Sequence, residues 1–137
     1  MDAQDLGYAL NQVVHNFGAV AVTAGAASGR WAAASAGPIQ RRVALLTLVG
    51  WAAQGASGAT FAVISYITYD RLPDIHGIAL AALSLKIACA VLGFSLSALY
   101  LARGPVWTES RRRATWTALL VCAVLALGAA AFLRWFS

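Results

Sequence analysis

Long apolar stretches separated by short polar connections dominate this chain. Four such stretches run approximately over residues 8–29, 43–69, 75–101 and 114–132, and we expect each to form one helix. Each is close to or above the ~20 residues that an α-helix needs to cross a hydrocarbon layer of ~30 Å. The pattern therefore predicts an all-α integral membrane protein, built as a bundle of four transmembrane helices.

Composition supports this prediction. Of the 137 residues, 61% are hydrophobic and only 11% are charged, and the mean hydropathy is +0.71. A soluble domain carries about 25% charged residues, so this chain lacks the polar surface that such a domain needs. We expect residues 1–137 to form a single transmembrane domain. We also expect the first helix to remain in the mature protein, because the N-terminus has no basic region followed by a short apolar core and a cleavage site.

The net charge of +5 comes from arginines beside the apolar stretches, so it predicts orientation in a membrane and not nucleic-acid binding. Arg71 and Arg134 are the only basic residues expected on one side. The connections after the first and third stretches contain seven arginines: 30, 41, 42, 103, 111, 112 and 113. We expect these connections in the cytoplasm, Arg111–Arg113 against anionic lipid headgroups, and both chain termini outside. The chain is then a multi-pass protein of the bacterial inner (plasma) membrane.

Small residues predict where helices pack closely. Ala21, Gly25 and Gly29 recur every four residues, and this spacing lets a neighbouring helix approach. Gly50, Gln54 and Gly58 should share one face of the second helix, which we therefore expect inside the bundle.

Local signals predict helix ends. Gly37-Pro38 is interpreted as a helix stop, and Pro73 fits the first turn of the third helix. Thr108 or Ser110 is a candidate N-cap of the fourth helix.

The two histidines carry the leading functional hypothesis. The topology places His15 and His76 at the outer ends of two different helices, at depths that differ by one or two turns. Two imidazoles from different helices can hold the iron of a b-type haem axially. Gly18 and Gly77 would make room for the macrocycle, and Arg71 would pair with a haem propionate. Asn11 or Asn16 would accept the second ring N–H of His15. The alternatives are a weaker site for a quinone, a divalent metal or a proton, and a packing role without a ligand.

Lys86 is the only lysine and lies in the middle of the third apolar stretch. A charge at this depth is costly, by about 2.5–3.5 kcal/mol on insertion scales, and marks a candidate functional site. We expect Gln54, at a similar depth, to be its hydrogen-bond partner, since the apolar stretches contain no carboxylate near it. Without a carboxylate beside it, we expect Lys86 to be neutral or to be solvated by Gln54, Ser84 or Thr60 and backbone carbonyls. Otherwise it predicts a partner subunit, a homo-oligomer or an anionic or quinone-like ligand. Snorkelling of the amine to the interface is the alternative.

Other chemistry finds little support. Cys89 and Cys122 both lie in apolar stretches, and we interpret them as packing residues. No nucleophile–base pair, carboxylate pair or phosphate-binding loop indicates a soluble enzyme, and the sequence leaves open whether the protein is an enzyme.

The leading hypothesis is a small membrane cytochrome b or redox subunit with haem b near the outer face. It would transfer electrons between the quinone pool and an outer-side partner. The alternatives are a small transporter or channel that uses Lys86, and a non-catalytic accessory subunit of a larger membrane complex.

Overall fold

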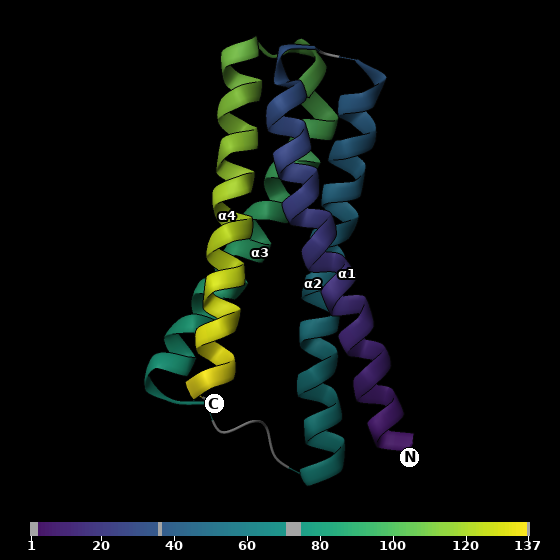
Figure 1. Ribbon diagram of the computed structural model, residues 1–137, viewed down its shortest axis with the longest axis vertical. Helices are drawn as coiled ribbons and strands as arrows, with labels where there is room; N and C mark the ends of the chain where they lie inside the picture. The colour runs from purple at the N-terminus through teal and green to yellow at the C-terminus, as the bar shows by residue number, and fades with distance from the viewer. Residues whose placement is uncertain (1–2, 36, 71–74, 137) are drawn as a thin grey trace.

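Four long α-helices form the protein, and short connections join them (Figure 1). The computed structural model describes residues 3–35, 37–70 and 75–136. The helices are α1 (Ala3–Trp31), α2 (Pro38–Tyr69), α3 (Gly77–Arg103) and α4 (Glu109–Phe136), with short 3-10 helices at Ala32–Ala34 (η1) and Gly104–Val106 (η2). The helices run alternately up and down, so η1 and η2 lie at the same end of the molecule (Figure 1). The predicted all-α four-helix bundle is confirmed.

The helices neighbour one another in chain order. α1 packs most extensively on α2 and α3 on α4, while the α2–α3 and α1–α4 contacts close the ring. α1 and α3 therefore lie diagonally across the bundle. The α1–α2 and α3–α4 pairs lie close together at the η1/η2 end and diverge toward the other end (Figure 1).

The helix ends partly match the predictions. Pro38 does not stop the first helix but is the first residue of α2, which therefore begins five residues before position 43. A proline suits this position because its fixed φ is helical and its missing N–H would have had no partner in the helix. Thr108 is confirmed as a cap, since its Oγ1 accepts a hydrogen bond from the backbone N–H of Arg111 at 3.3 Å. Pro73 lies outside the described residues.

The interior combines a few large side chains, among them Trp51, Trp116 and Leu119, with many small and polar ones, while most other large apolar side chains face outward. The buried polar or charged residues are Gln40, Thr47, Gln54, Ser57, Ser97 and Arg112. Exposed large apolar residues occur on every helix, for example Phe17, Val49, Val91 and Val124. Two segments, Gly77–Val106 and Glu109–Trp135, are long and apolar enough to cross a membrane by length and composition.

Glycines bring the helices into close contact where the sequence predicted it. Gly25 lies against Thr47 of α2, and Gly29 lies against the ring of Trp116 of α4. A Cβ at Gly50 would lie 2.9 Å from the Cβ of Ala21. Gly58, in contrast, is exposed and does not share the buried face of α2. That face instead continues from Gln54 to Ser57.

The arginine run at the start of α4 does not lie wholly on the surface. Arg112 is buried, and its Nε and Nη1 donate hydrogen bonds to the carbonyls of Ala33 at 3.1 Å and Trp107 at 2.6 Å. The expectation that all of Arg111–Arg113 faces lipid headgroups is therefore wrong for Arg112. Its guanidinium satisfies the carbonyl groups that η1 and the residue after η2 leave without helical partners.

Candidate functional site

A hydrogen bond across the diagonal of the bundle joins the only lysine to a histidine. Lys86 Nζ of α3 lies 2.9 Å from His15 Nε2 of α1. Both side chains are partly buried. Among the described residues Lys86 contacts no carboxylate, and the imidazole of His15 is the partner of its amine.

Ser57 of α2 completes the arrangement from the other side of the imidazole. His15 Nδ1 lies 2.7 Å from Ser57 Oγ, and Ser57 Oγ donates to the carbonyl of Ala53 at 2.5 Å. Ser57 is buried, with 2% of its surface exposed. Three helices thus each contribute one side chain, and both ring nitrogens of His15 are occupied.

One assignment of the protons fits all of these contacts. The hydroxyl hydrogen of Ser57 points to Ala53, so Ser57 Oγ accepts from His15 Nδ1–H. A neutral imidazole has one donor and one acceptor nitrogen, so Nε2 is the acceptor. Lys86, with three N–H donors, donates to it.

Two amide side chains hold the backbone around the triad of Lys86, His15 and Ser57. Asn11 Nδ2 donates to the carbonyl of Ser57 at 2.9 Å, and Gln54 Nε2 donates to the carbonyl of His15. Asn11 lies one turn before His15 on α1, and Gln54 lies one turn before Ser57 on α2. The two helices are thereby fixed in register at the level of the triad.

Aromatic rings form the adjoining wall. Phe61 meets the imidazole of His15 edge-on, with ring centroids 5.7 Å apart and an interplanar angle of 69°. Tyr8 stacks on Phe61 at 6.0 Å. These rings cover the triad toward the diverging end of the bundle and restrict how the imidazole can turn.

The other predicted site residues lie elsewhere. His76 is exposed and immediately precedes α3. Lys86 follows it by ten residues, about 15 Å along a helix axis, and His15 meets α3 at Lys86. Gly18 packs against α2, where a Cβ would lie 3.1 Å from Gln54 Nε2. Arg71 lies outside the described residues. The haem held by two histidines stays a prediction. If His15 Nε2 were to bind iron, its hydrogen bond with Lys86 would first have to break.

The partners of the predicted polar residues also differ from expectation. Gln54 was expected beside the Lys86 amine but donates to the His15 backbone. Asn16 accepts a hydrogen bond from Gln12 instead of from the His15 ring. Ser57 was missed, although it lies three residues after Gln54 in the polar middle of α2 and this spacing could have indicated it.

Metal-binding groups do not gather here. Within the described part of the chain, no three His, Cys, Asp or Glu side chains are placed to hold a metal ion together. Cys89 is buried beside Trp51, and Cys122 packs against the same cluster, in line with a packing role for both cysteines.

Comparison of the chain with known protein families, curated proteins and solved structures finds no match in any of the three. The class of the protein therefore follows from its own features. It is an all-α four-helix bundle with an apolar exterior and a lysine–histidine–serine triad in its polar interior.

Proposed function

We propose that all four helices cross a lipid bilayer. They contain between 27 and 32 residues, and at about 1.5 Å per residue even the shortest is about 40 Å long. Their exposed faces carry large apolar side chains, and many of their contacts are made by small and polar residues. A water-soluble bundle has the opposite distribution, whereas helices in lipid pack through small residues.

The orientation proposed for the bundle follows from its two ends. The arginine-rich connections lie together at the η1/η2 end (Figure 1). Basic residues beside transmembrane helices are retained in the cytoplasm. This places the η1/η2 end in the cytoplasm and the start of α1 and the end of α4 on the outer side of the inner membrane.

Within this bundle, we propose that Lys86 and His15 form the substrate site of a small membrane transporter. The observation that carries the proposal is the Lys86–His15 hydrogen bond, with an ammonium donor and a neutral acceptor. An ionisable residue inside a membrane bundle marks a substrate, ion or proton pathway by default. With a protonated Lys86 and no carboxylate among its described contacts, the site would suit an anionic group.

The same hydrogen bonds would link the binding of such an anion to the uptake of a proton. An anion bound by the Lys86 ammonium group would replace His15 Nε2 as its acceptor. The released nitrogen could then take up a proton, because Ser57 still accepts from Nδ1–H. The site would therefore load an anion and a proton together.

Transport into liposomes tests this function. Purified protein is reconstituted with a pH-sensitive dye inside the vesicles, and inward gradients of small carboxylates and of phosphate are applied one at a time. We expect acidification of the lumen with at least one anion, and a loss of at least tenfold in its rate in Lys86→Met. Arg134→Met, which removes an exposed charge at the outer end of α4, is the matched control and should retain the wild-type rate. Equal rates in wild type and Lys86→Met would refute the proposal.

A further inference from the structure

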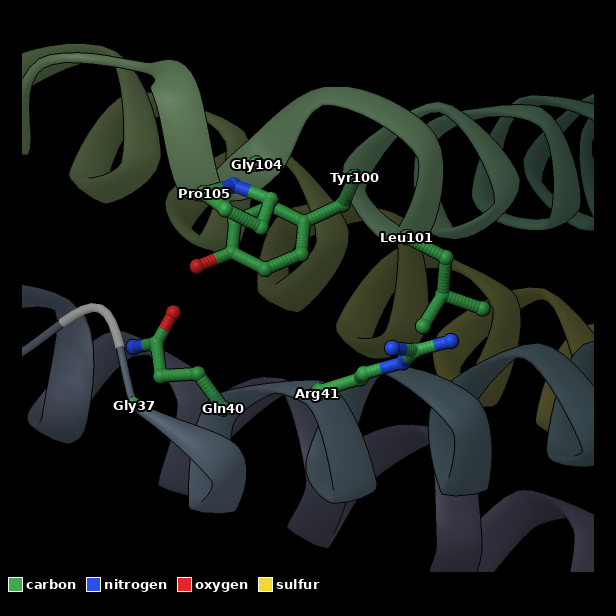
Figure 2. Close-up of a pocket in the computed structure, with 7 residues that line it drawn as sticks. All are labelled: Gly37, Gln40, Arg41, Tyr100, Leu101, Gly104 and Pro105. Carbon is green, nitrogen blue, oxygen red and sulfur yellow. The ribbon is translucent and has the colours of Figure 1, made fainter.

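A small cavity lies at the η1/η2 end of the bundle, the end proposed to face the cytoplasm, between the beginning of α2 and the end of α3 (Figure 2). It has a volume of about 30 Å³ and is lined by Gly37, Gln40, Arg41, Tyr100, Leu101, Gly104 and Pro105. A larger hollow of about 340 Å³ shares Arg41 and Leu101 with it and is otherwise lined by Pro38, Arg42 and Leu45. A volume of this size suits a small-molecule or headgroup site.

A tyrosine hydroxyl group lines the inner cavity. Tyr100 is 3% exposed, and its ring is held against Trp116 and Trp107 at centroid distances of 4.8 and 5.8 Å. Its Oη has no hydrogen-bond partner among the described residues and points across the cavity toward Gln40 (Figure 2). Because a tyrosine hydroxyl both donates and accepts hydrogen bonds, one that faces a cavity provides a contact for a polar group of a ligand.

Gln40 provides a fixed polar wall opposite Tyr100. Its Nε2 donates to the carbonyl of Gly29 at 3.1 Å, and its Oε1 accepts from Trp116 Nε1 at 3.2 Å. The amide is buried, with 3% exposure. Because both of its ends are engaged, the amide cannot turn, and the second lone pair of Oε1 remains available in the cavity.

The outer hollow has an almost wholly apolar lining, and two arginines border it. Arg41 and Arg42 are exposed and have no ion pair among the described residues. Leu45 lies one turn further along α2, on the same side and deeper in the proposed bilayer, and Leu101 faces it from α3. The beginning of α2, with Pro38 as its first residue, adds the partial positive charge of a helix N-terminus.

We propose that this site binds one anionic phospholipid from the cytoplasmic leaflet. The lipid phosphate lies between Arg41 and Arg42, and an acyl chain follows Leu45 and Leu101. A headgroup hydroxyl, or a water bound to it, bonds to Tyr100 Oη in the inner cavity. The site rests on the residence of the chain in a membrane and is independent of the chemistry of Lys86 and His15.

Lipid titration in detergent tests the site. The thermal unfolding of purified protein is followed while short-chain phosphatidylglycerol, short-chain phosphatidylcholine, glycerol phosphate or inorganic phosphate is added. We expect saturable stabilisation by phosphatidylglycerol only. The double variant Arg41→Gln/Arg42→Gln removes two charges and should weaken the apparent affinity for phosphatidylglycerol by roughly 30-fold. Tyr100→Phe, which keeps the ring packing, should weaken it by several-fold. Arg134→Gln, at the opposite end, should leave it unchanged.

Three results would overturn the proposal. Equal stabilisation by phosphatidylcholine would show that only the acyl chains matter. An effect of inorganic phosphate or glycerol phosphate that matches the lipid would assign the site to a free anion. If Arg134→Gln lost as much affinity for phosphatidylglycerol as the Arg41/Arg42 double variant, the overall charge, and not this hollow, would attract the lipid. None of these results bears on transport, so this proposal and the transporter proposal fail separately.

Discussion

Lys86 Nζ and His15 Nε2 lie 2.9 Å apart although the two residues are separated by 71 positions in the chain and belong to diagonally opposite helices. The contact gives the only lysine a partner within its own chain. The sequence suggested a partner subunit because it showed no carboxylate near Lys86. Because His15 is such a partner, Lys86 no longer indicates another subunit. A homo-oligomer or a larger complex stays a prediction that this residue does not support.

A double-mutant cycle should measure this contact. His15→Ala and Lys86→Met each remove one partner, and we expect a coupling free energy of about 1–2 kcal/mol, because the donor is charged. Reversible unfolding in mixed detergent measures the four free energies of unfolding. In a control cycle that pairs His15→Ala with Arg134→Met, the two changes in the free energy of unfolding should add to within about 0.5 kcal/mol. A His15–Lys86 coupling no larger than this control would contradict the hydrogen bond.

The tautomer of His15 is a second prediction. With Ser57 Oγ as acceptor and Lys86 as donor, the neutral ring should carry its hydrogen on Nδ1. Nitrogen-15 NMR of histidine-labelled protein distinguishes the two ring nitrogens, and the His76 resonances provide the internal reference. Ser57→Ala removes the acceptor and should shift the tautomer equilibrium of His15 but not that of His76. A ring protonated on Nε2 in the wild type would contradict the assigned direction.

Two glycines at helix contacts should resist substitution. A Cβ at Gly29 would overlap the ring of Trp116, and one at Gly93 would overlap the ring of Trp51. We expect Gly29→Ala and Gly93→Ala to lower the free energy of unfolding by about 1–3 kcal/mol, because a buried indole ring has little room to move.

Gly55 and Gly128 are the matched controls for these substitutions. Each lies within a helix, and a Cβ there would meet nothing within 4 Å. Alanine favours the helix by up to about 1 kcal/mol over glycine, so Gly55→Ala and Gly128→Ala should be neutral or stabilising. The predicted close packing would be refuted if all four variants behaved alike in thermal unfolding.

The proposed orientation predicts which end a membrane-impermeant thiol reagent reaches. Ser110 is exposed at the η1/η2 end, and Asp5 is exposed in the first turn of α1. In a variant with Cys89 and Cys122 replaced by serine, Asp5→Cys should be labelled in intact spheroplasts and Ser110→Cys only after lysis. Labelling of Ser110→Cys from outside would reverse the orientation.

The haem hypothesis makes its own prediction. If His15 and His76 hold a b-type haem, purified protein from haem-replete cells should show a sharp Soret band and resolved bands after reduction with dithionite. His15→Ala and His76→Ala should each abolish them. Ligation of the haem iron by His15 Nε2 would also require the hydrogen bond between Lys86 and His15 to break. The variant Lys86→Met, which lacks this bond, should therefore retain the pigment. A colourless preparation would contradict the haem hypothesis, and the hydrogen bonds of His15 would then be the only contacts assigned to its ring nitrogens.

The sequence alone determined the four helices and the end at which the arginine-rich connections gather. These features depend on the length and composition of continuous stretches, which are local properties. The same holds for Thr108 as the cap of α4 and for the small-residue stripe that contains Gly25 and Gly29, because both patterns can be recognised within a few turns of the sequence. The partners of these glycines on the other helices could not be predicted in this way.

Only the tertiary structure decided which side chains meet. Apolar periodicity indicates the buried side of a helix but not its neighbours, and the ring order of the four helices sets those. That order brought Lys86 to His15 rather than to Gln54, revealed Ser57 behind the imidazole, and buried Arg112 against the carbonyl of Ala33. Each of these contacts joins residues more than 40 positions apart. Their geometry depends on how far each helix is rotated and shifted against the others, which packing of the whole bundle determines.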